Sequence, residues 1–230
     1  MAFYYLLLGH LIGDFALQTD KIAENKGKHW KWNLLHVLVV TLVTTVFSYS
    51  FGALLLGLVF LNGIIHFVMD YYKSRICKKL HLSELTGFLF DQFIHVILLY
   101  IISKTAVYGI EPLMDYKTVS ILITLMIITF FSAVLTQFVL AALFPKVDNR
   151  FFREGEKYMG ILTRIYGGIV FYISFIKSPY YLLLLGLAAV LFFLKFKLGW
   201  NKWMSPSHLV VKLLLDTVIS LVCIFPVLFL

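Results

Sequence analysis

Charged residues and cysteine are scarce in this chain, and each scarcity excludes a class of protein. Asp, Glu, Lys and Arg make up 14% of the 230 residues, whereas an ordinary soluble domain carries about 25%. The two cysteines, Cys77 and Cys223, are far apart and match no zinc or redox spacing. The chain also has no Gly-x-Ser-x-Gly element, so it lacks that signature of acyl transfer by a serine nucleophile.

Hydrophobic residues are abundant instead, at 61% of the sequence, which is more than a soluble core can bury. A helix needs about 20 apolar residues to cross a bilayer. The sequence therefore predicts an all-α fold, a polytopic transmembrane bundle of about eight helices, arranged as two four-helix halves at 1–104 and 105–230. The predicted spans lie at about 3–19, 33–50, 52–72, 88–104, 118–143, 159–176, 179–197 and 208–229.

The basic residues predict the orientation of these helices. All but three of the 20 Lys and Arg residues fall in or beside the first, third, fifth and seventh connections, the exceptions being Lys104, Lys117 and Lys177. Basic loops stay on the cytoplasmic side, so loops 20–32, 73–87, 144–158 and 198–207 are predicted inside and both termini outside. The formal charge of +8 is then explained by loops facing an anionic leaflet, without a nucleic-acid partner.

Ionisable residues recur inside the first four apolar segments. The patterns are His10-x-x-x-Asp14, a single His36, His66-x-x-x-Asp70 and the reversed Asp91-x-x-x-His95. Residues four apart share a helix face, and in antiparallel helices the reversed order places every His deeper in the membrane than its Asp. The pattern predicts one shared site near the cytoplasmic boundary, with Gln18, Asn62 and Gln92 as polar neighbours.

Three interpretations of this pattern remain open. A lone buried His or Asp is usually a structural group bonded to a neighbouring helix, and His/Asp pairs at i and i+4 could be simple ion pairs. Four imidazoles and three carboxylates at one depth instead suit a divalent metal. We expect one or two ions, zinc first and manganese second, held by His10, Asp14, His36, His66, Asp70, Asp91 and His95.

These motifs, in this order over about residues 6–96, resemble a family of uncharacterised bacterial polytopic membrane proteins that carries only a domain-of-unknown-function name. They are also similar to a broader group described as membrane-bound metal-dependent hydrolases. The resemblance implies a multi-pass protein of the bacterial cytoplasmic membrane, a metal and a hydrolytic reaction.

The predicted function is hydrolysis of a lipid or lipid-linked ester or phosphoester at the cytoplasmic leaflet. Asp14, Asp70 and Asp91 are the candidate catalytic carboxylates, and Lys73 and Arg164 the candidate substrate-binding cations. A metal-ion or proton-coupled transporter, or a metal-stapled structural or regulatory protein, are the alternatives. In the second half, His208, Lys212 and Asp216 share one helix face, and Arg164 either pairs with Asp216 or binds a phosphate. The oligomeric state is left open.

Overall fold

The computed structural model describes residues 1–144, 160–175 and 206–224, and all regular elements in these ranges are helical. The chain forms two compact units, Met1–Met126 and Ile127–Leu230. The division of the chain into halves at 1–104 and 105–230 stays a prediction.

Four helical stretches in the described ranges are long and apolar enough to cross a membrane: Trp30–Phe51, Ala53–Lys79, Glu84–Ser103 and Tyr116–Leu143. A shorter apolar helix covers Ala2–Ala16. The prediction of an all-helical membrane protein is confirmed at this level. The predicted span at 179–197 and most of the loops at 144–158 and 198–207 lie outside the described residues, and the orientation of the termini stays a prediction.

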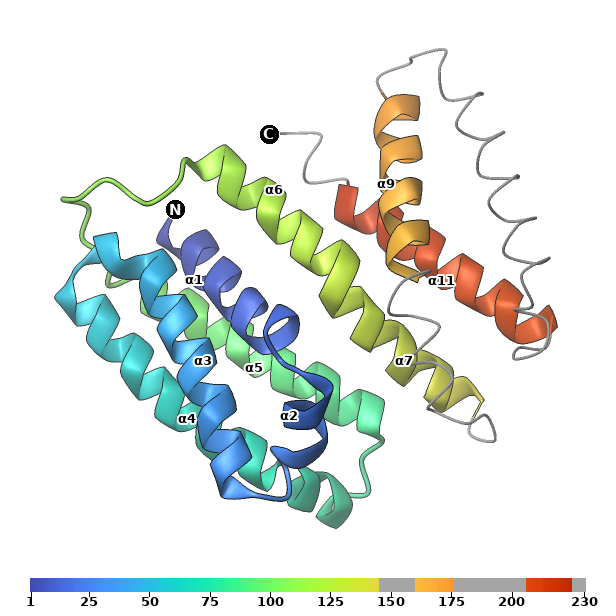
Figure 1. The fold of residues 1–230 in the computed structure, drawn as a ribbon, viewed down its shortest axis with the longest axis horizontal. Helices are drawn as coiled ribbons and strands as arrows, with labels where there is room; N and C mark the ends of the chain where they lie inside the picture. Colours follow the sequence, from blue (N-terminus) through green and yellow to red (C-terminus); the bar gives the residue numbers. More distant parts are fainter. Residues whose placement is uncertain (145–159, 176–205, 225–230) are drawn as a thin grey trace. The chain divides into compact units, whose positions relative to one another are not determined.

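The first unit is an antiparallel bundle (Figure 1). Helix α1 packs against α3, α5 and α6, and α4 packs against both α3 and α5. Thr19 caps the short helix α2, and Ser83 caps α5, each through its side-chain oxygen. The elements are α1 (Ala2–Leu11), η1 (Ile12–Ala16), α2 (Asp20–Asn25), α3 (Trp30–Ser48), η2 (Tyr49–Phe51), α4 (Ala53–Lys79), α5 (Glu84–Ser103) and α6 (Tyr116–Met126).

Two glycines let α1 and η1 lie directly against α3. A Cβ added to Gly9 would come within 2.6 Å of the Thr44 Cα, and one added to Gly13 within 2.6 Å of the Val40 Cα. This spacing of four, with backbones in close approach, is a common way for membrane helices to pack. In this crossing Asp14 contacts His36 of α3, while the His10 ring lies beside His66 of α4 and His95 of α5.

We expect Gly13→Ala to destabilise the first unit, because its methyl group has no room beside Val40. The cost should be roughly 1–3 kcal/mol, as for other overpacked cores. Thermal unfolding in detergent measures it. Gly57→Ala is the matched control, because nothing lies within 4 Å of a Cβ at that glycine. Equal Tm values for the two variants would contradict the close crossing.

The second unit contains a single-turn π-helix, η3 (Ile127–Phe131), followed by α7 (Ser132–Leu143), α9 (Ile161–Phe175) and α11 (Pro206–Ile224). Helix α9 packs against both α11 and η3, and α11 packs against α7. The predicted spans at 159–176 and 208–229 correspond to α9 and α11 within the described ranges.

Candidate metal centre

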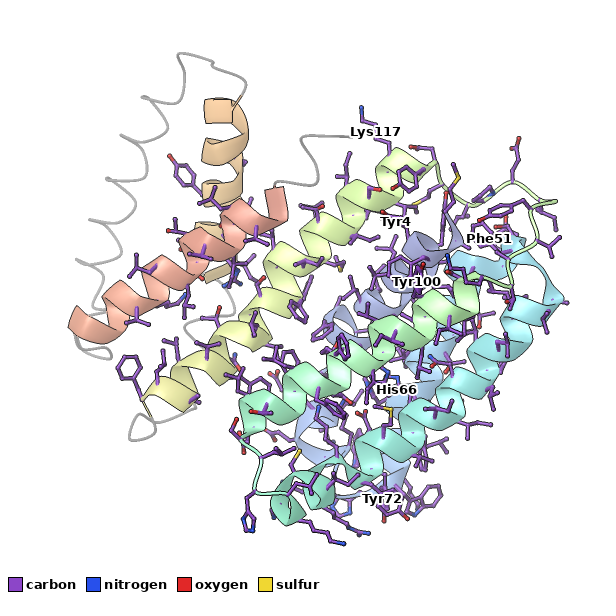
Figure 2. The ribbon with its side chains drawn as sticks, turned by 180° about the vertical axis from the view of Figure 1, so that it is seen from behind. Tyr4, Phe51, His66, Tyr72, Tyr100 and Lys117 are labelled. Atoms are coloured by element: carbon purple, nitrogen blue, oxygen red, sulfur yellow. The ribbon has the colours of Figure 1, made fainter. Side chains whose placement is uncertain are left out.

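The seven predicted site residues lie in the core of the first unit. All seven are buried, and none is more than 6% exposed. They come from α1 with its π turn η1, from α3, from α4 and from α5. Figure 2 shows His66 within the bundle, between Phe51 near one end and Tyr72 near the other. The antiparallel register inferred from the reversed motif on α5 therefore brings the motifs together.

The four imidazole rings form one connected group. Ring centroids are 5.3 Å apart for His36 and His66, 4.3 Å for His66 and His95, and 5.0 Å for His95 and His10. His10 and His66 are 5.6 Å apart. Each ring comes from a different helix, so the group depends on the tertiary packing of all four.

A compact donor set lies at one side of this group. One ligand atom from each of Asp14, His36 and His66 lies within 4.8 Å of the others. His36 Nε2 is 3.0 Å from Asp14 Oδ1, and Asp70 Oδ2 is 3.4 Å from the Nε2 atoms of both His36 and His66. Tetrahedral zinc with bonds of about 2.0–2.1 Å places its ligand atoms about 3.3 Å apart. The buried group of Asp14, His36 and His66 could therefore hold a metal ion with little movement.

Many of these polar atoms make no hydrogen bond within the described residues. They are both ring nitrogens of His10 and His95, and the Nε2 of His66. One oxygen each of Asp14, Asp70 and Asp91 also lacks a well-formed hydrogen bond, although a Lys or His nitrogen lies within 4 Å of it. A buried polar atom without a partner costs about 1–3 kcal/mol, and folded proteins keep few of them. A cation among imidazole nitrogens and carboxylate oxygens would satisfy several at once, so the donor chemistry fits a divalent metal.

Lys26, which the sequence analysis assigned only to a basic loop, reaches into the donor set. Its Nζ lies 2.9 Å from Asp70 Oδ2, 3.7 Å from Asp14 Oδ1 and 3.0 Å from His36 Nε2. Burial lowers the pKa of this ammonium, but the charges of Asp70 and Asp14 outweigh it, so the pKa of Lys26 is raised. Thr19 as a helix cap could have predicted that a short helix begins at Asp20, but not that this helix brings Lys26 to the site.

Asp91 and His95 occupy the other side of the ring group. Their Oδ1 and Nε2 atoms are 3.5 Å apart, while Lys73 Nζ donates to Asp91 Oδ2 at 2.8 Å. The Gln92 amide donates to Asp14 Oδ2 at 3.2 Å and approaches Asp91 Oδ2 at 3.4 Å. The Gln92 side chain therefore links the two carboxylates, in agreement with its prediction as a polar neighbour of the site.

The predicted second-half residues belong to the second unit, where Arg164, Lys212 and Asp216 form a buried cluster of their own. Arg164 Nη1 is 3.0 Å from Asp216 Oδ1, and Lys212 Nζ is 2.7 Å from Asp216 Oδ2. Arg164 also donates from Nε and Nη2 to the carbonyls of Ile128 and Thr129 in η3. The pairing of Arg164 with Asp216, one of the two predicted alternatives, is present, while its binding of substrate phosphate stays a prediction. Nothing is described of the His208 side chain.

The charges of the centre are nearly balanced by side chains alone. Three carboxylates, on Asp14, Asp70 and Asp91, face two ammonium groups, on Lys26 and Lys73. Lys26 contacts Asp70 and Asp14, and Lys73 contacts Asp91, while the predicted depth of the Asp and His residues in the membrane stays a prediction. Such a site can bind a cation, hold a proton at an imidazole or carboxylate, and present an ammonium group to an anion.

Searches of curated proteins and of solved structures found no match to this chain. A comparison with protein families matched residues 2–120, which include every helix that contributes to the metal centre. On this match over half of its length, the chain belongs to the family described as Protein of unknown function (DUF3307).

Proposed function

We propose that this protein is a membrane-embedded, metal-dependent hydrolase that cleaves a lipid or lipid-linked phosphoester at the cytoplasmic leaflet. The proposal includes zinc as the metal, about eight spans in the bacterial cytoplasmic membrane, and both termini outside. The observation that carries it is the convergence of four imidazoles and three carboxylates, many of whose polar atoms make no hydrogen bond.

The residues divide into roles by their distances. His36, His66 and Asp14, with Asp70 beside both imidazoles, would hold the metal. When bound, the ion supplies a water nucleophile with a pKa near 7 and stabilises negative charge on the reacting oxygen. His10, His95 and Asp91 lie next to this set, where they would accept the proton of the attacking water and return it to the leaving group.

Lys73 supports an anionic substrate. Its ammonium pairs with Asp91 while its side chain is 31% exposed, so it can reach both the site and a head group. A phosphate oxygen would pair with this cation by a charge-assisted hydrogen bond. A neutral ester offers a carbonyl oxygen but no negative charge to pair with the ammonium, and we therefore favour a phosphoester.

The test is turnover of bacterial phospholipids and polyprenyl phosphates by zinc-loaded protein in liposomes. We expect Asp14→Asn to lose both metal and turnover, because Asp14 belongs to the compact donor set. Asp91→Asn should retain metal and lose about 10²-fold or more in turnover, as expected when a general base is removed. Glu111→Gln, an exposed carboxylate outside the centre, is the control and should match the wild type.

Ion flux, measured in the same liposomes, separates the alternatives. Metal-dependent flux without hydrolysis would replace the hydrolase with a transporter. Bound metal with neither activity would leave a metal that only fastens the four helices together. Loss of metal in Asp91→Asn would contradict the division of roles given above.

A further inference from the structure

Lys26 contacts the donor set at three points, and each contact uses an atom that a metal would need. The Nζ atom lies 2.9 Å from Asp70 Oδ2, 3.0 Å from His36 Nε2 and 3.7 Å from Asp14 Oδ1. The single ammonium group therefore already offsets about half of the negative charge of Asp14 and Asp70. The Lys26 ammonium group thus occupies the place of a bound cation and carries the same sign of charge, but it is covalently attached to the chain.

The chemistry of His36 makes this contact incompatible with a bound metal. A neutral imidazole nitrogen has one lone pair or one hydrogen. In one tautomer His36 Nε2 accepts from Lys26, and in the other it donates to Asp14 Oδ1, 3.0 Å away. Coordination of a metal through Nε2 would use the same lone pair, so the hydrogen bond from Lys26 would have to break.

Electrostatic repulsion also opposes binding of a metal beside the Lys26 ammonium group. A metal bound to His36 at about 2.1 Å could lie no more than about 5 Å from Nζ in its present place, because Nζ is 3.0 Å from the same nitrogen. A divalent ion and an ammonium so close together repel strongly at a buried site. If the ammonium leaves, the charge of the ion replaces that of Lys26 at Asp14 and Asp70.

The local structure allows the Lys26 side chain to leave the donor set. Its side chain is 20% exposed, so the ammonium can reach water by turning about its own side-chain bonds. The next residue, Gly27, is exposed, and nothing lies within 4 Å of a Cβ built there. The segment after α2 can therefore shift without a clash at Gly27.

We propose that Lys26 is an internal cation that occupies the Asp14, His36 and Asp70 donors until a divalent metal displaces it into the cytoplasmic interface. The inference rests on the metal site of the proposed function but not on its hydrolytic activity. It assigns Lys26 a positioning role: the residue weakens metal binding and offsets part of the charge of Asp14 and Asp70 when metal is absent.

Zinc titration calorimetry on the full-length protein in detergent tests the proposal. Lys26→Met keeps the length of the side chain and removes its charge. We expect Lys26→Met to bind zinc with a Kd about tenfold lower than that of the wild type. A change of this size lies within the usual range of coupling between two ligands. Lys28→Met, which removes an exposed charge from the same connection, should leave the Kd unchanged.

A second measurement needs no variant. Reductive methylation followed by mass spectrometry reports the accessibility of each lysine in the wild-type protein. We expect Lys26 to be protected without zinc and several-fold more reactive with it, while Lys28 reacts equally in both states.

The outcomes separate this inference from the proposed function. Zinc binding of equal or lower affinity in Lys26→Met, or unchanged labelling of Lys26 on binding, would overturn the displacement and leave the metal site standing. Absence of zinc binding in both the wild type and Lys26→Met would overturn the metal site and the inference together. Tighter binding and zinc-dependent labelling without hydrolysis would support the inference and contradict the hydrolase.

Discussion

Zinc should raise the Tm of the purified protein, because an ion held by α1, α3 and α4 binds only the folded state. At a free zinc concentration about 100 times its Kd, the gain is about 2.7 kcal/mol. Protons compete with metal for imidazole nitrogens, so the gain should be smaller at acidic pH. Thermal unfolding with chelator and with zinc, at pH 7.5 and 5.5, measures both effects.

His36→Ala is the variant that tests whether the predicted site causes this gain. Its chelator-treated form should unfold as one transition, and zinc should move its Tm little, since the variant lacks one of the three compact donors. A zinc effect of wild-type size in His36→Ala, or a gain that grows as the pH falls, would place the metal elsewhere.

Arg164→Met should destabilise the second unit by about 3–5 kcal/mol, the range for breaking a buried ion pair from one side. The variant removes the ion pair to Asp216 and the donors to the carbonyls of Ile128 and Thr129. Those carbonyls belong to a π-helical turn, where main-chain bonding departs from the α-helical pattern. Chemical denaturation followed by circular dichroism measures the loss.

Two further variants serve as comparisons for Arg164→Met. Arg75→Met removes an exposed guanidinium that stacks on Tyr71 and Tyr72, and should cost less than about 1 kcal/mol. Arg164→Lys keeps the charge but loses the planar donor arrangement, so it should recover only part of the stability. A stable Arg164→Met protein with weakened phospholipid binding would instead favour the predicted contact with substrate.

Long apolar segments were enough to predict a helical membrane protein, and residue spacing was enough to predict which residues converge. The i and i+4 spacing places His66 and Asp70 on one face of α4, and the reversed order of Asp91 and His95 fits a helix running the opposite way. Both inferences need only helical geometry and alternating direction. The predicted first span at 3–19 ends earlier, at Ala16, because Thr19 begins a new helix as its cap.

Lys26 and Gln92 could not be assigned in the same way. Their contacts with Asp14 join residues far apart in sequence, and they depend on how α2 folds back and how α5 is rotated. A basic residue in a connection predicts the orientation of the chain in the membrane, whether its side chain faces water or a buried carboxylate. The position of Lys26 in a basic connection therefore did not indicate that it contacts the site. The position of Arg164 beside η3 likewise depends on a π turn, which the spacing of apolar residues does not predict.

Elemental analysis of the purified protein tests the metal centre most directly. The wild-type protein, purified without chelator and dialysed against metal-free buffer, should retain one or two equivalents of a divalent metal per chain, with zinc foremost. His66→Ala should retain less than about a tenth of that amount. His66 belongs to the compact donor set, and its Nε2 atom lies 3.4 Å from Asp70 Oδ2. Equal metal content in folded wild-type and His66→Ala protein, or no metal in wild type after incubation with zinc, would contradict the account.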